Sequence, residues 1–373
     1  MRKAQYVWWW LFGASFIFGH LGRYLAPNSI IGRINLLDLA VLLAVTLYIK
    51  KIKVDKLLQG FMALLVFSFF IGFAMFGFTT QPESLFFLLR LLVYLLFISV
   101  APTIFGKRSS SFLMLLGVLT AVVGLFQLKV FPSIPVSMIA THGFDPHNGR
   151  LFATFFDPNF AAVVLLITIL ATLNLLFAKY SHQTLLALLI QLYAMILTNS
   201  RSGLLALLVG LTVFFLMKDR KYLLLLVSFS MVAFVLSPAL SARIRSAVSL
   251  DATSQARFAS WQTAQLIVNE SPIIGVGYNN YAGASTFVGR YHQRVGNIAL
   301  SANASDSSLL TLWATVGLLG MVIFLLYWLS LTLQNQPLIN SAVGAIIVNS
   351  FFLNSWLWPF TLFLLALVIV KEK

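Results

Sequence analysis

Charged residues are scarce in this sequence, and cysteine is absent. Only 9% of its 373 residues are Asp, Glu, Lys or Arg, whereas 60% are hydrophobic. The lack of cysteine excludes disulfides and thiolate metal sites. So few charged residues cannot form the surface of a soluble protein of this length. The composition therefore predicts an integral membrane protein, with the lipid bilayer as its solvent.

Acidic residues are the scarcer of the two charge types. Ten Asp and Glu stand against 25 Lys and Arg, which gives a formal net charge of +15. The basic residues lie in short clusters between hydrophobic runs rather than in one patch. This distribution indicates membrane topology and argues against nucleic-acid binding.

The hydrophobic runs define the expected fold. With about 17 to 23 residues for each crossing, the chain should be an all-α integral membrane protein of about twelve transmembrane helices. The expected helices cover residues 4–20, 35–50, 57–79, 84–105, 111–131, 158–177, 183–199, 202–217, 222–237, 307–329, 337–353 and 357–370.

The lysines orient these helices. If the N-terminus is cytoplasmic, nearly every lysine falls in an inner loop or at the C-terminus, as the positive-inside rule requires. Both termini are then cytoplasmic. Two long segments, 132–157 and 238–306, lie outside, the second between the ninth and tenth helices. Polar loops on a rigid scaffold often carry function, so we expect the functional residues there.

Arginines occur on the outer side, where the positive-inside rule disfavours them. They are Arg150, Arg243, Arg245, Arg257, Arg290 and Arg294, with Arg201 at the turn between the seventh and eighth helices. A planar guanidinium suits bidentate phosphate binding better than lysine does, so this choice points to a phosphate-bearing ligand. For Arg243, Arg245, Arg290 and Arg294, ordinary loop charge is an equal alternative.

Four short motifs interrupt the hydrophobic pattern. The first runs from Arg150 to Asn159, and its Asp157-Pro158 pair is also a natural helix start. The others are a Ser-Arg-Ser-Gly turn at 200–203, an Arg257-x-x-x-Trp261 segment leading to Pro-Ile-Ile-Gly-Val-Gly-Tyr at 272–278, and a Gly-Leu-Leu-Gly helix. Asp306, at the start of that last helix, is either an N-cap or a general base.

In this order, the motifs resemble the O-antigen ligase and polymerase superfamily over about residues 145–325. The resemblance implies a GT-C-like, metal-independent glycosyltransferase of the bacterial inner membrane, acting on the outer face. Its donor would be an undecaprenyl-diphosphate-linked glycan and its acceptor a glycan or lipid hydroxyl. Arg201 and Arg257 match arginines that handle the donor diphosphate. The substrate-binding candidates are Arg150, Asp157, Asn159, Trp261, Tyr278 and Asn280.

One position departs from the family pattern. Ligases place a His-Asn pair where this chain has Asp306-Ser307, so Asp306 becomes the candidate base and a polymerase-like member becomes more plausible. His292 is a minor alternative base.

The sequence also has to be compared with a metal site, a secondary transporter and a non-catalytic binder. His142, Asp145 and His147 lack the spacing of a four-ligand metal site, so no metal or other cofactor is expected. A secondary transporter of about twelve helices would place charges near the bilayer midplane. Here Asp38 and Arg90 fall near the outer helix ends, where we expect them to pair. A non-catalytic binder of polyprenyl-linked glycan is the third possibility.

Overall fold

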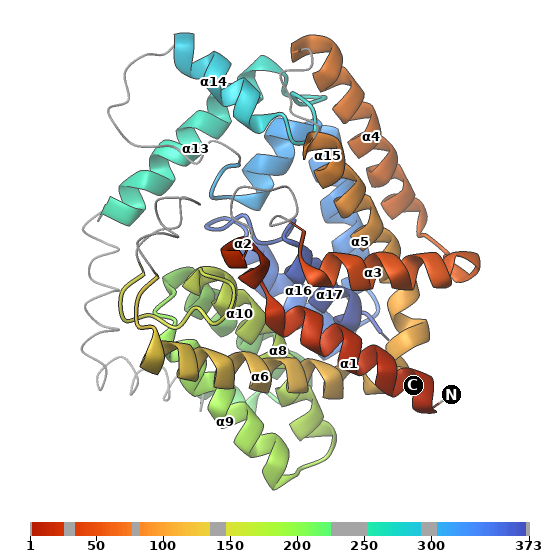
Figure 1. Ribbon diagram of the computed structural model, residues 1–373, viewed down its shortest axis with the longest axis vertical. Helices are drawn as coiled ribbons and strands as arrows, with labels where there is room; N and C mark the ends of the chain where they lie inside the picture. Colours follow the sequence, from red (N-terminus) through yellow and green to blue (C-terminus); the bar gives the residue numbers. More distant parts are fainter. Residues whose placement is uncertain are drawn as a thin grey trace.

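The computed structural model describes residues 2–25, 34–76, 83–134, 147–224, 252–291 and 304–370, and the regular secondary structure of these residues is helical (Figure 1). The longer helices are α1 (Arg2–Phe18), α3 (Leu36–Leu47), α4 (Lys56–Phe76), α5 (Glu83–Phe105), α6 (Ser109–Val130), α8 (Pro158–Ala178), α9 (His182–Leu197), α10 (Arg201–Lys218), α13 (Ala252–Glu270), α14 (Tyr281–Tyr291), α15 (Ser308–Thr332), α16 (Pro337–Asn349) and α17 (Pro359–Val368). Each expected run corresponds to one of them except 222–237, which lies largely outside the described residues.

Five stretches of the described chain are long and apolar enough to cross a membrane, which agrees with an α-helical membrane protein. They are Lys56–Met75, Ser84–Val130, Pro158–Ala178, Arg201–Lys218 and Ser308–Thr332, and the second contains both α5 and α6. Four expected crossings form shorter helices: α3, α9, α16 and α17 have 12, 16, 13 and 10 residues. At about 1.5 Å per residue, none of these alone spans a hydrocarbon core of about 30 Å.

The break between α16 and α17 differs from the continuous helices expected there. The chain leaves α16 at Asn349 and resumes helix at Pro359, with an irregular segment between. Ser308 supports this segment, because its hydroxyl accepts the Trp356 N–H at 3.0 Å and donates to the Leu353 carbonyl at 3.0 Å. Irregular backbone at membrane depth is tolerated where protein groups satisfy it.

Helices α8 and α17 form the centre of the bundle. α8 packs against α6, α9, α10, α16 and α17, and α17 also packs against α5 (Figure 1). Ile, Leu, Val and Ala on all sides of α8 are buried, so this helix is apolar around its whole circumference.

Helices α1 and α17 run antiparallel through this centre. The Phe16 ring lies 5.3 Å from that of Phe360, and the Phe12 ring lies 5.2 Å from that of Phe363. The start of α1 and the end of α17 therefore lie at the same end of the bundle, where Figure 1 marks both termini. The predicted cytoplasmic side of both termini stays a prediction.

The predicted pairing of Asp38 with Arg90 is confirmed. Nη1 of Arg90 lies 3.6 Å from a carboxylate oxygen of Asp38. The same carboxylate accepts hydrogen bonds from the Tyr94 hydroxyl and the Asn35 N–H, both at 2.8 Å. A buried carboxylate is costly unless it is paired and hydrogen-bonded, and this one is both.

Candidate functional site

Arg150 joins the first motif to the Ser-Arg-Ser-Gly turn. Its Nε donates to the Thr198 carbonyl at 2.9 Å, and its Nη2 lies 3.4 Å from the carbonyl of Asn199. These carbonyls follow the C-terminal end of α9, where backbone acceptors lack intrahelical partners and attract positive charge. Arg150 therefore fixes the backbone that leads into Arg201.

Asn159 anchors the same turn from α8, and Asp157 begins this helix. Asp157 is the N-cap of α8, as predicted, and accepts the Asn159 N–H at 2.6 Å. Burial raises the pKa of the Asp157 carboxyl, while this N–H and the Arg150 charge oppose the rise. The Asn159 side-chain oxygen accepts the Ser200 hydroxyl at 2.9 Å. Their predicted roles in substrate binding stay predictions.

Arg201 is the first residue of α10 and is half-buried. Ser200 caps this helix by accepting the Gly203 N–H at 3.3 Å. Gly203 packs so closely on α8 that an added Cβ would lie 2.6 Å from the Cβ of Ala162. The Ser200 cap and the close contact between α10 and α8 thus hold the Arg201 backbone. Arg201 lies at the N-terminus of α10, where the first backbone N–H groups lack intrahelical partners.

Arg257 and Asp306 belong to two segments that are hydrogen-bonded together. Arg257, Ser260 and Trp261 share one face of α13, because they are spaced i, i+3 and i+4. The Ser260 hydroxyl accepts the Asp306 N–H at 2.9 Å. Trp261 packs at 6.2 Å on the ring of Phe352. The contact between Ser260 and Asp306 brings the Arg-x-x-x-Trp helix to the start of α15.

The alternative of Asp306 as an N-cap was wrong. The cap of α15 is Ser307, whose hydroxyl accepts the Leu310 N–H at 3.3 Å and donates to the Ser350 carbonyl at 2.9 Å. Burial and the negative charge of Asp306 both raise the pKa of Tyr281. Helix capping therefore does not account for the Asp306 carboxylate.

The two glycine-containing motifs are bonded to each other. α15 breaks at Gly317, which has φ 75° and ψ 177°. There the Val276 N–H donates to the Ala314 carbonyl at 2.9 Å, and the Leu318 N–H donates to the Pro272 carbonyl at 3.0 Å. The segment after α13 thus replaces hydrogen bonds that the break removes from α15. Periodicity does not reveal this contact, and a glycine inside an apolar helix was the only signal.

Substitution of Gly275 tests this contact. Its φ is +80°, and an added Cβ would lie 2.5 Å from the Gly317 nitrogen, so we expect Gly275→Ala to destabilise the protein by roughly 2 kcal/mol or more. Thermal unfolding in detergent measures the change. Gly283→Ala is the matched control, because Gly283 lies in α14 with open space around it and alanine favours a helix. Equal melting temperatures for the Gly275 variant and its parent would contradict the assignment.

Tyr278 and Asn280 follow the glycine segment but lie in different surroundings. Asn280 is buried, and its amide nitrogen lies 3.4 Å from the Val276 carbonyl. Tyr278 lines a pocket with residues of α5 and α17. Substrate contact by either residue stays a prediction. Several other candidates lie outside the described residues, namely His142, Asp145, Arg243, Arg245, His292, Arg294 and the side chain of Arg290.

Comparison with known proteins gives one match for this region. Residues 186–325 match a family model described as O-antigen ligase. The matched range includes Arg201, Arg257 and Asp306. No curated protein matched the chain.

Proposed function

We propose that this chain, a member of the O-antigen ligase and polymerase superfamily by its domain at residues 186–325, transfers glycan from an undecaprenyl-diphosphate carrier to an acceptor hydroxyl. The reaction takes place at the outer face of the bacterial inner membrane, and both termini are cytoplasmic. The observation that carries this proposal is the match of an O-antigen ligase domain to a helical membrane protein whose motif segments are hydrogen-bonded together.

Arg201 and Arg257 bind the donor diphosphate in this proposal. Two guanidiniums offset its charge in the ground state and stabilise the charge that develops as the bond from the sugar to the diphosphate oxygen breaks. The support for Arg201 is its fixed backbone at the start of α10. The support for Arg257 is its position on α13, one turn before the residue that holds Asp306.

Asp306 is the general base in this proposal. The acceptor hydroxyl attacks the anomeric carbon, its proton passes to the Asp306 carboxylate, and the undecaprenyl diphosphate leaves. Among the other candidates, Arg150 and Asn159 support the turn that carries Arg201, and Asp157 caps the helix that carries Asn159. Trp261, Tyr278 and Asn280 complete the proposed substrate-binding residues. No metal ion takes part.

The purified full-length chain provides the test. Incubated with defined undecaprenyl-diphosphate glycans and candidate acceptors in the presence of a metal chelator, it should yield acceptor extended by the glycan, together with free undecaprenyl diphosphate. Mass spectrometry identifies both products. Accumulation of unchanged glycan on the far side of a proteoliposome membrane would instead indicate a transporter. Binding of donor without any product would indicate a non-catalytic binder.

A further inference from the structure

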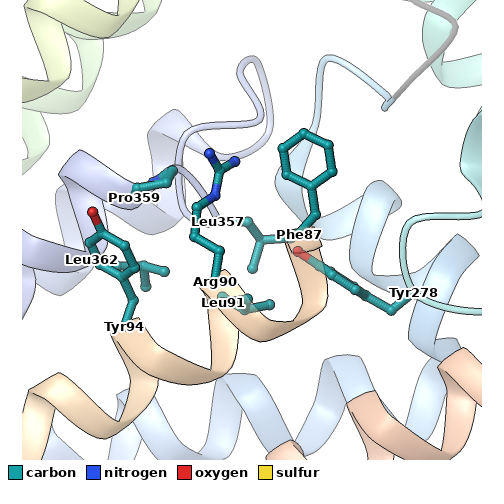
Figure 2. A pocket seen from close by; sticks show the side chains of 8 residues that line it. All are labelled: Phe87, Arg90, Leu91, Tyr94, Tyr278, Leu357, Pro359 and Leu362. Carbon is teal, nitrogen blue, oxygen red and sulfur yellow. The ribbon is translucent and has the colours of Figure 1, made fainter. Parts of the chain in front are cut away.

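A pocket lies at the start of α5, and none of its lining residues belongs to the Ser-Arg-Ser-Gly turn. Arg90 and Phe87 of α5 line it together with Tyr278, which follows α13, and with Leu357 and Pro359 at the start of α17 (Figure 2). Three segments far apart in the sequence therefore enclose one guanidinium, the phenols of Tyr94 and Tyr278, and several apolar side chains. The Tyr94 hydroxyl donates to Asp38. None of the four motifs includes Arg90.

The Arg90 side chain is held in a fixed direction. Nη1 lies 3.6 Å from Asp38, and Cζ lies 4.6 Å from the centroid of the Phe87 ring. Figure 2 shows the guanidinium extending away from the α5 backbone, between Phe87 and the Leu357–Pro359 segment. A cation held by a carboxylate and an aromatic face is preorganised, so binding of an anion costs little additional ordering of this side chain.

Tyr278 supplies a neutral hydrogen-bond donor to the same pocket. Burial raises the pKa of Tyr278 to about 12, while the charge of Arg90 opposes the rise. The hydroxyl therefore keeps its proton at neutral pH. In Figure 2 the Tyr278 side chain enters from another segment, with its hydroxyl toward the centre of the lining residues.

We propose that Arg90, together with Tyr278 from the proposed substrate-binding residues, forms a second anion site, which binds the phosphate of a membrane lipid. A guanidinium and a hydroxyl can both donate to phosphate oxygens, and an apolar surrounding strengthens those bonds by excluding water. The apolar walls formed by Phe87, Leu357 and Pro359 suit the hydrocarbon next to a lipid phosphate rather than a free, fully hydrated ion. The site thus takes an amphiphile, with its phosphate on Arg90.

Two lipids carry this chemistry. One is the polyprenyl carrier, whose relevance rests on the proposed function, and the other is an anionic phospholipid of the surrounding bilayer. Both place a phosphate beside a hydrocarbon chain, so the pocket chemistry is shared. Competition between them identifies the occupant.

Native mass spectrometry of the full-length chain in detergent tests the site. The measurement uses Arg201→Ala/Arg257→Ala protein, so that the two arginines proposed for the donor diphosphate contribute no binding. Undecaprenyl phosphate should bind this protein more tightly than undecaprenol does. Adding Tyr278→Phe should raise the Kd about threefold, and adding Arg90→Met with Asp38→Asn should raise it at least about tenfold.

Two controls accompany these variants. Tyr193→Phe removes an exposed hydroxyl from α9, and Arg108→Met removes a guanidinium from the 3-10 helix η4 (Gly106–Arg108); neither should change the Kd. If phosphatidylglycerol at the same concentration displaces undecaprenyl phosphate, the site binds the phosphate of a phospholipid. If undecaprenyl phosphate stays bound, the site binds the polyprenyl carrier. Unchanged Kd values in both pocket variants would overturn the site. Because binding is read without glycan transfer, an inactive wild-type protein would refute the proposed function and leave this result standing.

Discussion

Alanine in place of Arg201 or Arg257 should reduce glycan transfer at least about a hundredfold while the protein still folds. In the proposed reaction each guanidinium stabilises charge that grows on the diphosphate as the glycosidic bond breaks, so its loss should raise the barrier more than it weakens donor binding. We expect kcat to fall more than KM rises. The measurement is the rate of product formation by mass spectrometry, with each variant first shown to be monodisperse and to melt near the parental temperature.

Lysine variants and a matched arginine sharpen this experiment. Arg201→Lys and Arg257→Lys should recover little activity, because an ammonium lacks the bidentate fork of a guanidinium. Arg220→Ala is the control, since Arg220 is exposed just beyond the opposite end of α10 and its loss should leave the rate unchanged. Parental rates in both alanine variants would remove the proposed role and leave these arginines as surface charge.

Hydropathy located the helices well but could not locate all of their ends. The run at 337–353 continues through Phe351, Phe352 and Leu353, which are as hydrophobic as a helix requires. The structure nevertheless ends α16 at Asn349, because Ser307 and Ser308 satisfy the irregular backbone that follows. Those partners lie more than 40 residues away, as the separations of 43 and 45 residues show. A window along the sequence does not detect them.

The charged pair was easier to predict than the contact between glycines. Asp38 and Arg90 stand alone in apolar runs, so the cost of an unpaired buried charge is enough to predict that they meet. Gly275 and Gly317 have no charge to bury, so no comparable free-energy cost predicts that they meet. Their contact depends on two backbones approaching closely and exchanging hydrogen bonds, which side-chain chemistry does not show.

Among the candidate site residues, the arginines were chosen because they conflict with the positive-inside rule, and their role stays a prediction. The contacts that support these segments were not predicted. Arg150 was expected to contact substrate, and the structure shows that it binds the carbonyls of Thr198 and Asn199. Ser260 was not singled out at all, because a serine on a polar helix gives no signal in the sequence. A side chain that bonds to the backbone of another segment is recognised only in a structure that shows both the side chain and that backbone group.

Asp306→Asn should slow glycan transfer by about a hundredfold or more and leave the melting temperature unchanged. Asparagine keeps the size of the side chain but cannot accept a proton from the acceptor hydroxyl. Because Ser307 is the N-cap of α15, Asp306→Ala should also retain the cap.

Ser307→Ala is the matched control for this experiment. It should lose about 1 kcal/mol of stability through the cap while each folded molecule keeps its rate. Thermal unfolding and the rate of product formation, measured on the same preparations, distinguish the capping role of Ser307 from the proposed catalytic role of Asp306. If the Asp306→Asn protein transfers glycan at the parental rate, Asp306 is not the base, and the proton must pass to another group such as His147 or His292.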